Sequence, residues 1–322
     1  MTHPLHIRKS ILLAAVFILC LTLAGETGNT AQKDHTTTFH PFPLYSAITN
    51  NVSFWERVYA TYSNDTIIVH DRDDLRKVYT TISLPSPRNG DDRKKNLRKE
   101  KEITEKYEKM LLALRNRPPK TAEEKRVAAF FTGPDRKQQL AKAAERVRTQ
   151  NGQRQRFRNS VRRSGAYLPT FKEIFRSYNL PEDLAYLPHV ESSFHSRVYS
   201  KVGACGIWQF TKTTGERYLI IDDAVDERLD PIASTHAAAR YFRRSYNHLQ
   251  HWPLAITSYN YGLPGTIRAQ KEFRSYPKVF AKHRTQSFQF ASRNFYSEFI
   301  AAKNIAKKLE KNISLRKPEK TC

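Results

Sequence analysis

The sequence predicts a mainly α-helical protein with a sizeable core and one main domain, and three observations support this. Apolar residues recur at spacings of three and four along much of the chain, and prolines and capping side chains stand where helices would begin. Hydrophobic residues make up 39% of the 322 positions, which is enough to bury a sizeable core. The length suits one main domain with an extension.

Residues 1–25 have the pattern of a secretory signal. Arg8 and Lys9 form a basic start, Ile11–Leu23 is an apolar run, and small residues around Ala24 suit a cleavage site. The run is shorter than the roughly 20 residues that a membrane-spanning helix needs, so a retained anchor is the lesser alternative. We expect an exported protein.

Cysteines are sparse. Leu19 precedes Cys20 where lipoprotein processing needs a small residue, so we reject a lipid anchor. Removing the signal leaves Cys205 and Cys322, which indicate no disulfide framework. Cys205 is expected to be a small buried thiol rather than a nucleophile.

Residues 26–90 are predicted to form a small N-terminal unit and a linker. The interpretation is a helix, a short strand at Thr66–Val69, a second helix and a break at Pro85–Gly90. The residues that indicate the two helices are Phe54, Trp55, Val58 and Tyr59, followed by Leu75, Val78, Tyr79 and Ile82.

The chain is strongly basic, with a formal net charge of +24, which implies an anionic partner. Residues 91–163 contain 23 Lys or Arg against 10 Asp or Glu, and interspersed apolar residues predict that 91–164 is a basic helical segment. Nucleic-acid binding would need stacking aromatics, and Arg146–Arg163 offers only Phe157, so no nucleic acid is expected. A solvated helix face is favoured over attraction to an anionic envelope surface.

The stretch from Leu180 to Phe210 contains the main candidate site. Pro181 suits a first helical position, although Pro188 could kink the last turn. Glu191 continues the apolar stripe of Leu184 and Leu187. A carboxyl group there would be partly desolvated, which raises its pKa and suits a general acid.

An aromatic ring and an amide follow a glycine-rich bend at Trp208 and Gln209. Such a pair could bind a sugar, with the ring on its apolar face and the amide on its hydroxyl or N-acetyl groups. The alternative, at even weight, is that Trp208 and Phe210 belong to the core and that Glu191 is a paired structural acid.

Later segments indicate structure more than chemistry. Asp230 before Pro231 predicts a helix N-cap, and Asp226–Arg228 is expected to form ion pairs rather than a second catalytic carboxylate. Another helix should start near Pro253 and end at Gly262 in a left-handed conformation. The histidine spacings fit no zinc site, so we expect no metal and no cofactor.

Three ordered blocks resemble a known family: ES at 191–192, GIWQ at 206–209 and SYN at 258–260. They are similar to the signature blocks of the family 1 lytic transglycosylases, which cleave peptidoglycan and have a goose-lysozyme-like fold. The similarity covers residues 165–303, which is the predicted catalytic domain, and favours the membrane-bound lytic transglycosylase D branch. Residues 304–322 would be a basic tail. The expected location is the periplasm or envelope of a bacterium.

The resemblance implies cleavage of the β-1,4 bond between N-acetylmuramic acid and N-acetylglucosamine. In this family one glutamate, here Glu191, first donates a proton and then accepts one from the muramic C6 hydroxyl, which leaves a 1,6-anhydro ring. The implied substrate-binding residues are Ser200, Gln209, Tyr259, Asn260 and Trp208. Ser192 would steady the backbone. Ser258 and Pro264 depart from the family pattern without removing a reacting group.

Two alternatives remain open. A hydrolytic muramidase would need a second carboxylate or a positioned water, and a catalytically inactive wall-binding protein would keep only the sugar site. The partner in each case is the glycan strand of peptidoglycan. The sequence gives no oligomeric state.

Overall fold

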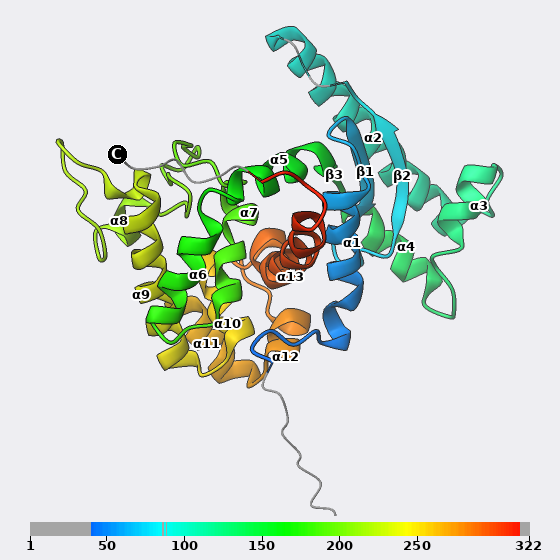
Figure 1. Ribbon diagram of the computed structural model, residues 1–322. Coiled ribbons are helices and arrows are strands. Elements are labelled where there is room, and N and C mark those ends of the chain that lie inside the picture. Colours follow the sequence, from blue (N-terminus) through cyan, green and yellow to red (C-terminus); the bar gives the residue numbers. More distant parts are fainter. Residues whose placement is uncertain (1–39, 86, 88, 316–322) are drawn as a thin grey trace, which may run out of the picture. The chain divides into compact units, whose positions relative to one another are not determined.

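The computed structural model describes residues 40–85, 87 and 89–315, which belong to one compact unit (Figure 1). They are mostly helical, with one small sheet, which confirms the predicted mainly α-helical class. The predicted signal at 1–25 lies outside the described residues. Within the described part of the chain, no helix is both long and apolar enough to cross a bilayer.

The first half of the described chain contains the three strands as well as helices. In chain order they are η1 (Ser46–Ile48), α1 (Thr49–Ala60), β1 (Thr66–Asp71), β2 (Val78–Ser83), α2 (Gly90–Asn116), α3 (Ala122–Ala128), α4 (Arg136–Ala144), β3 (Val147–Asn151), α5 (Arg154–Ser164) and α6 (Leu168–Ser177). The second half is helical. It contains η2 (Glu182–Tyr186), α7 (Pro188–Glu191), α8 (Lys212–Gly215), η3 (Glu227–Leu229), α9 (Pro231–Leu249), α10 (Trp252–Tyr261), α11 (Leu263–Phe273), α12 (Tyr276–Lys282) and α13 (Phe290–Glu310).

The three strands form an antiparallel sheet in the order β2-β1-β3. Ile68 of β1 lies opposite Thr81 of β2 and Gln150 of β3. The predicted helix around Val78 and Tyr79 is therefore wrong, because this segment is strand β2. Its valine, tyrosine, threonine and isoleucine side chains favour a pleated, half-buried surface, and pairing with β1 satisfies the backbone.

The two faces of β1 contribute to two separate cores. Successive side chains of a strand point to opposite faces, so Ile68 joins the main core while Val69 joins the smaller one. The main core includes residues from α1, α5 to α7 and α9 to α13. The smaller core lies between the sheet and α2 to α4, and Tyr79 and Tyr107 stack within it at 5.7 Å between ring centroids.

The predicted basic segment is mostly helical, as expected, but Val147–Asn151 is strand β3. This strand pairs with β1, so the sheet joins the predicted N-terminal unit to the predicted basic segment. The long helix α2 starts at a cap: Asn89 accepts hydrogen bonds from the backbone of Asp91 and Asp92, whose charges also suit the helix dipole.

The capping predictions for the later helices are mostly confirmed. Asp230 accepts hydrogen bonds from the backbone of Ile232 (2.7 Å) and Ala233 (2.8 Å), and Pro231 is the first residue of α9. Gly262 follows α10 with a positive φ of 90° but with ψ at 138°. It therefore ends the helix as predicted, though not in the left-handed helical conformation.

Helix α13 lies in the main core. It packs against α1, α5, α7 and α10, so the segment 290–299 packs back on the preceding helices, as predicted (Figure 1). The helix continues to Glu310, so residues 304–310 of the predicted basic tail belong to it.

Candidate active site

Glu191 is the last residue of the short helix α7. The stretch before it is not one helix: a 3-10 helix, η2, ends at Tyr186, and Pro188 begins α7. Proline fits there because its missing N–H would have no partner in a first turn. Pro188 thus starts the helix that positions Glu191 instead of kinking an earlier one.

The carboxyl group of Glu191 is desolvated, as the sequence predicts. Burial raises its pKa from 4.5 to about 8, so the neutral acid predominates at neutral pH. His189, two residues earlier, adds no positive charge, because burial lowers its pKa to about 3 and its Nδ1 contacts the Ser160 hydroxyl at 2.7 Å. A protonated carboxylic acid is the group that a general acid requires.

The backbone after Glu191 is strained and firmly held. Ser193 and Phe194 both have positive φ, of 53° and 58°, which costs each about 1–2 kcal/mol for a residue with a Cβ. Arg163 donates two hydrogen bonds to the Ser193 carbonyl, from Nε (3.0 Å) and Nη2 (2.7 Å). The Phe194 ring is buried against His189, with 4.5 Å between centroids. Packing therefore offsets the strain next to the candidate acid.

Ser192 links this turn to the GIWQ loop. Its hydroxyl donates to the Ile207 carbonyl at 2.8 Å, and the side chain is buried. This confirms that Ser192 steadies the backbone around Glu191.

Gly206 is required by close packing in the same loop. It has φ of 79°, and a Cβ there would lie 1.8 Å from the Arg228 carbonyl oxygen. Arg228 is held by Asp226 through two hydrogen bonds, Nε to Oδ1 (2.9 Å) and Nη2 to Oδ2 (2.7 Å). This confirms the predicted ion pair. Arg228 also donates to the carbonyls of Gly203 and Phe210, so the pair fastens the loop.

Ser200 and Gln209 both hydrogen-bond within this loop. The Ser200 hydroxyl accepts from the backbone N–H of Ala204 at 3.0 Å. The Gln209 amide donates to the carbonyls of Val198 (3.2 Å) and Gly206 (2.9 Å). Both side chains are partly exposed, so each can also be approached from solvent.

Trp208 does not have the position that stacking on a sugar requires. Its side chain is fully buried, and its indole N–H donates to the Thr235 hydroxyl at 2.8 Å. The ring lies between Phe171 and Phe175, with centroids 5.9 and 5.7 Å away. The structure therefore favours the alternative interpretation, in which Trp208 belongs to the core, because its ring gains more from burial than from exposure.

Tyr259 is placed near Glu191 by the backbone of the GIWQ loop. Its hydroxyl donates to the Trp208 carbonyl at 2.8 Å, and its ring stacks on Phe242 with centroids 5.2 Å apart. Burial raises its pKa well above 10, and the negative charge of an ionised Glu191 raises it further. The phenol therefore remains a neutral hydrogen-bond donor.

Asn260 is exposed, and its side chain connects two helices. Its Oδ1 accepts a hydrogen bond of 2.6 Å from the hydroxyl of Ser292, in the first turn of α13. The residue thus fixes the end of α10 to the start of α13.

The sequence interpretation missed a second carboxyl group, Glu298 in α13. Burial raises its pKa to about 8, and the charge of Glu191 raises it too, while Arg148 and a hydrogen bond with Tyr59 act in the opposite direction. Two carboxyls coupled in this way do not both ionise easily. Glu298 could have been found as Glu191 was, by its place on an apolar helical stripe, because Phe295, Glu298 and Ala302 lie on one face of the helix.

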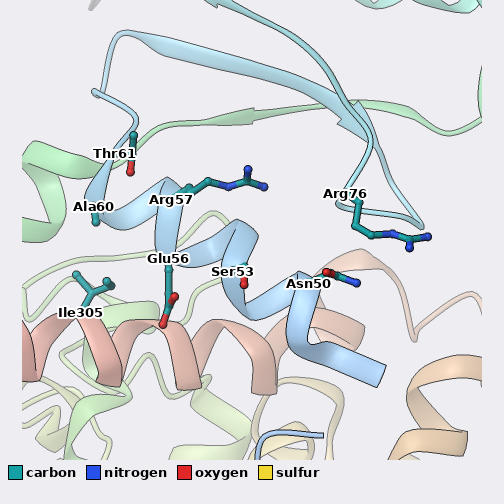
Figure 2. A pocket seen from close by; sticks show the side chains of 8 residues that line it. All are labelled: Asn50, Ser53, Glu56, Arg57, Ala60, Thr61, Arg76 and Ile305. Atoms are coloured by element: carbon teal, nitrogen blue, oxygen red, sulfur yellow. The ribbon is translucent and has the colours of Figure 1, made fainter. Parts of the chain in front are cut away.

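The predicted site residues do not line the pocket between α1 and α13 (Figure 2). This pocket has a volume of about 520 Å³ and is lined by Asn50, Ser53, Glu56, Arg57, Ala60, Thr61, Arg76 and Ile305. Figure 2 shows Glu56 pointing from α1 toward α13, where it accepts a 3.0 Å hydrogen bond from Asn304. The acid of this pocket is thus already engaged in joining the two helices.

Comparison with known proteins identifies the class of the domain. Residues 170–279 match the family model of the Transglycosylase SLT domain. The matched range includes Glu191, the GIWQ loop and Tyr259, and the chain therefore contains a Transglycosylase SLT domain. This confirms the resemblance to the family 1 lytic transglycosylases.

Individual relatives agree with this class. The chain is 36% identical over 95 residues to the membrane-bound lytic murein transglycosylase D of Escherichia coli, in strain K12 and in strain O6:H1. It is 31% identical over 115 residues to a protein named for tributyltin chloride resistance in Alteromonas sp. (strain M-1). The first match covers 29% of this chain and 21% of the relative, and the last covers 34% and 56%. The matched segment thus spans about a fifth of the length of the Escherichia coli proteins.

Proposed function

We propose that the chain is a lytic transglycosylase that cleaves the β-1,4 bond between N-acetylmuramic acid and N-acetylglucosamine in peptidoglycan. The observation that carries this proposal is Glu191, whose carboxyl has its pKa raised to about 8 inside the segment that matches the Transglycosylase SLT domain. A carboxyl with such a pKa can donate and accept a proton near neutral pH.

In the proposed reaction, Glu191 acts twice. As the bond between C1 of the muramic residue and the glycosidic oxygen breaks, the Glu191 acid protonates that oxygen and becomes a carboxylate. The muramic C6 hydroxyl then attacks C1, and its proton passes to Glu191. The products are a free N-acetylglucosamine hydroxyl and a 1,6-anhydromuramic end, no water is consumed, and Glu191 regains its starting state.

The neighbouring side chains supply position and hydrogen bonds in this proposal. Tyr259, whose hydroxyl donates to the Trp208 carbonyl, stays neutral beside Glu191 and lies near the charge that develops at C1. Ser200 and Gln209 orient the N-acetyl and hydroxyl groups of the muramic residue. Asn260 holds the end of α10 through Ser292. The backbone carbonyl of Trp208 accepts the hydrogen bond of the Tyr259 hydroxyl and so holds this ring in place.

The test is mass spectrometry of purified peptidoglycan digested by the protein. Muropeptides one water lighter than those from lysozyme are expected with the wild type. They should be absent with Glu191→Gln, which keeps the size of the side chain and removes its proton transfer. A Glu191→Gln protein that still forms anhydro products would contradict the proposal.

A hydrolytic muramidase is the second candidate, and Glu298 is the observation that favours it. Hydrolysis requires a second carboxylate to act as nucleophile or to activate water, and Glu298 is a carboxyl electrostatically coupled to Glu191. The same digestion separates the two reactions. Full-mass reducing ends that disappear with Glu298→Gln would establish hydrolysis. Tight glycan binding without any product would instead indicate a binding protein.

We also propose that the protein works in the bacterial envelope, outside the cytoplasm. The apolar run after Arg8 and Lys9 supports export, and the name of the Escherichia coli relatives describes a membrane-bound murein enzyme. The basic residues of 91–163 would add attraction to an anionic envelope surface, which weakens with salt. Fractionation of cells that make the full chain tests the location: recovery in the cytoplasm would contradict export.

A further inference from the structure

A separate pocket lies at the start of α13. Its volume is about 330 Å³, at the lower end of the range for small-molecule sites. It is lined by Arg72, Asp73, Arg284, Thr285, Gln286, Phe288, Gln289, Phe290 and Arg293. None of these is a predicted site residue.

The lining is positively charged, since it contains three arginines and one carboxylate. Asp73 is shared: its Oδ1 accepts 2.8 Å from Nη2 of Arg293 and lies 3.8 Å from Nε of Arg72. Arg284 donates to the backbone carbonyls of Phe280 and His283. Burial and the positive charges of Arg293 and Arg72 lower the pKa of Arg284, while the carboxylate of Asp73 acts in the opposite direction. The lining therefore has more positive than negative side chains.

Arg293 is the buried member of this group. Its side chain is only 6% exposed, and its Nη2 also donates to the Arg72 carbonyl at 2.9 Å. Its Nε–H is buried and has no hydrogen-bond partner among the described residues. A buried guanidinium is costly unless negative charge or acceptors surround it, so this side of the pocket favours an anion.

The N-terminus of α13 opens at the same place. The first N–H groups of a helix have no partner within the helix, and the dipole attracts negative charge there. In this helix of 21 residues, no side chain caps the first turn and no acidic residue lies in it. The N-cap residue, Gln289, instead donates to the carbonyls of Thr285 and Gln286. Helix end and arginines thus favour the same kind of ligand, an oxyanion.

The pocket is adjacent to the candidate active site through α13. Ser292, one residue before Arg293, holds Asn260, which follows Tyr259. A glycan that reaches Asn260 would therefore lie one residue of α13 away from Arg293, which lines the pocket. In peptidoglycan the substituents of the glycan are peptide stems, which end in carboxylates.

We propose that this arginine-lined pocket binds a carboxylate of the peptide stem borne by the muramic residue. The inference rests on the proposed function for the identity of the substrate. Guanidinium groups bind carboxylates through paired, charge-assisted hydrogen bonds, and the uncapped N–H groups of α13 would add to them. The pocket would then determine whether the protein prefers glycan that still bears peptides.

Calorimetric titration with a stem tetrapeptide, in the absence of cleavage, tests the pocket directly. The double variant Arg72→Gln, Arg284→Gln changes its two more exposed arginines and leaves buried Arg293 in place. We expect the affinity for the tetrapeptide to fall by about tenfold or more. Arg115→Gln, on the exposed side of α2, is the matched control and should bind as the wild type does. Equal thermal unfolding of the variants shows that they fold.

Three outcomes would overturn the inference. One is an unchanged affinity in the double variant, and another is equal binding of a tetrapeptide whose carboxylates are all converted to amides. The third is binding of inorganic phosphate without binding of the tetrapeptide, which would make the pocket a phosphate site.

Cleavage assays separate this inference from the proposed function. Glycan with and without its peptides is digested in parallel, and kcat/KM is compared. The wild type should prefer the peptide-bearing glycan, and the double variant should lose that preference through KM. If the wild type cleaves neither glycan, the proposed function fails, while the titration still shows whether the pocket binds the tetrapeptide. If it cleaves both equally well, the inference fails and the proposed function stands.

Discussion

Glu191 and Asp226, the carboxyl groups at the two ends of the segment 191–226, have pKa values that are shifted in opposite directions. Burial raises the pKa of Glu191 to about 8. Asp226 has its pKa lowered, because Arg228 donates to both of its oxygens. Burial therefore decides the charge of Glu191, whereas the guanidinium of Arg228 outweighs the effect of burial on Asp226.

The difference separates two uses of an acid. An ionised carboxylate paired with arginine fastens a loop, whereas an acid without such a partner keeps its proton and can donate it. Asp226 and Arg228 secure the loop that contains Gly206, and the same loop supplies the carbonyl that positions Tyr259. The ion pair of Asp226 and Arg228 thus helps to shape the surroundings of Glu191, the proposed acid.

The largest expected effect comes from exchanging the two acids for amides. Glu191→Gln should lower the release of soluble muropeptides by roughly 10²- to 10⁴-fold, because proton transfer is lost. Its melting temperature should not fall, since a neutral amide replaces a desolvated acid. Asp226→Asn should show the reverse, with lower stability and most of the turnover kept. Equal turnover in the two variants would contradict the assignment of proton transfer to Glu191 and of a structural role to Asp226.

A second effect should follow from removing the partner of Asp226. Arg228→Met leaves a partly buried carboxylate and two backbone carbonyls without their donor, and should lower the free energy of unfolding by about 3 kcal/mol. Urea denaturation measures it. Arg217→Met, on an exposed arginine of the same segment, is the control and should behave as the wild type.

The pH dependence of stability should distinguish the two kinds of acid. The folded pKa of Glu298 is raised from 4.5 to about 8, so its contribution is fully present below about pH 4.5 and is lost as the pH rises toward 8. Asp226 has a lowered pKa, so its contribution is present above about pH 4 and is lost as the pH falls. The stability of the wild type relative to Glu298→Gln should therefore decrease between about pH 5 and about pH 8.

Comparing wild type with variant at each pH cancels the histidine contributions. His70 and His189 have lowered pKa values, so their contribution to the stability of the protein is lost as the pH falls. Both histidines are present in the wild type and in the variant, so they affect both proteins alike. A difference that stays constant from about pH 5 to about pH 8 would show that Glu298 is ionised throughout.

The smallest effect is expected at Ser292. Ser292→Ala removes the hydrogen bond to Asn260 and should cost about 1 kcal/mol of stability or less. Because Asn260 would then be free to move, KM for glycan should rise more than kcat falls. A lower kcat at constant KM would instead place Ser292 nearer to the reacting groups.

Local signals predicted much of the fold. Asp230 caps α9 and Pro231 is its first residue, so the start of this helix depends on neighbouring residues alone. Helix α1 has a clear apolar stripe. Strand β2 was missed because Val78, Tyr79 and Ile82 also fit helical spacing. Only pairing with β1, whose partner residues lie 8 to 17 positions earlier in the chain, decides between helix and strand, and a single segment does not contain that information.

The candidate site was predicted unevenly for a similar reason. The desolvation of Glu191 followed from its place on the stripe of Leu184 and Leu187. Trp208 was misjudged because the chemistry of an indole does not reveal which neighbours bury it. Glu298 was overlooked among the aromatic residues of α13, although the same stripe argument applies to it. Its coupling to Glu191 depends on packing between α7 and α13, which spacing cannot show.

Helix α13 also sets a fixed length scale. Ser292, next to the arginine-lined pocket, and Glu298, coupled to Glu191, are six residues apart, which corresponds to about 9 Å of rise along the helix. A helix is stiff over that length, so the interval does not change with loop motion. Inserting a single residue between the two would lengthen it by about 1.5 Å and rotate one end by about 100° relative to the other. The continuous helix therefore keeps a constant distance between the arginine-lined pocket and the carboxyl group of Glu298.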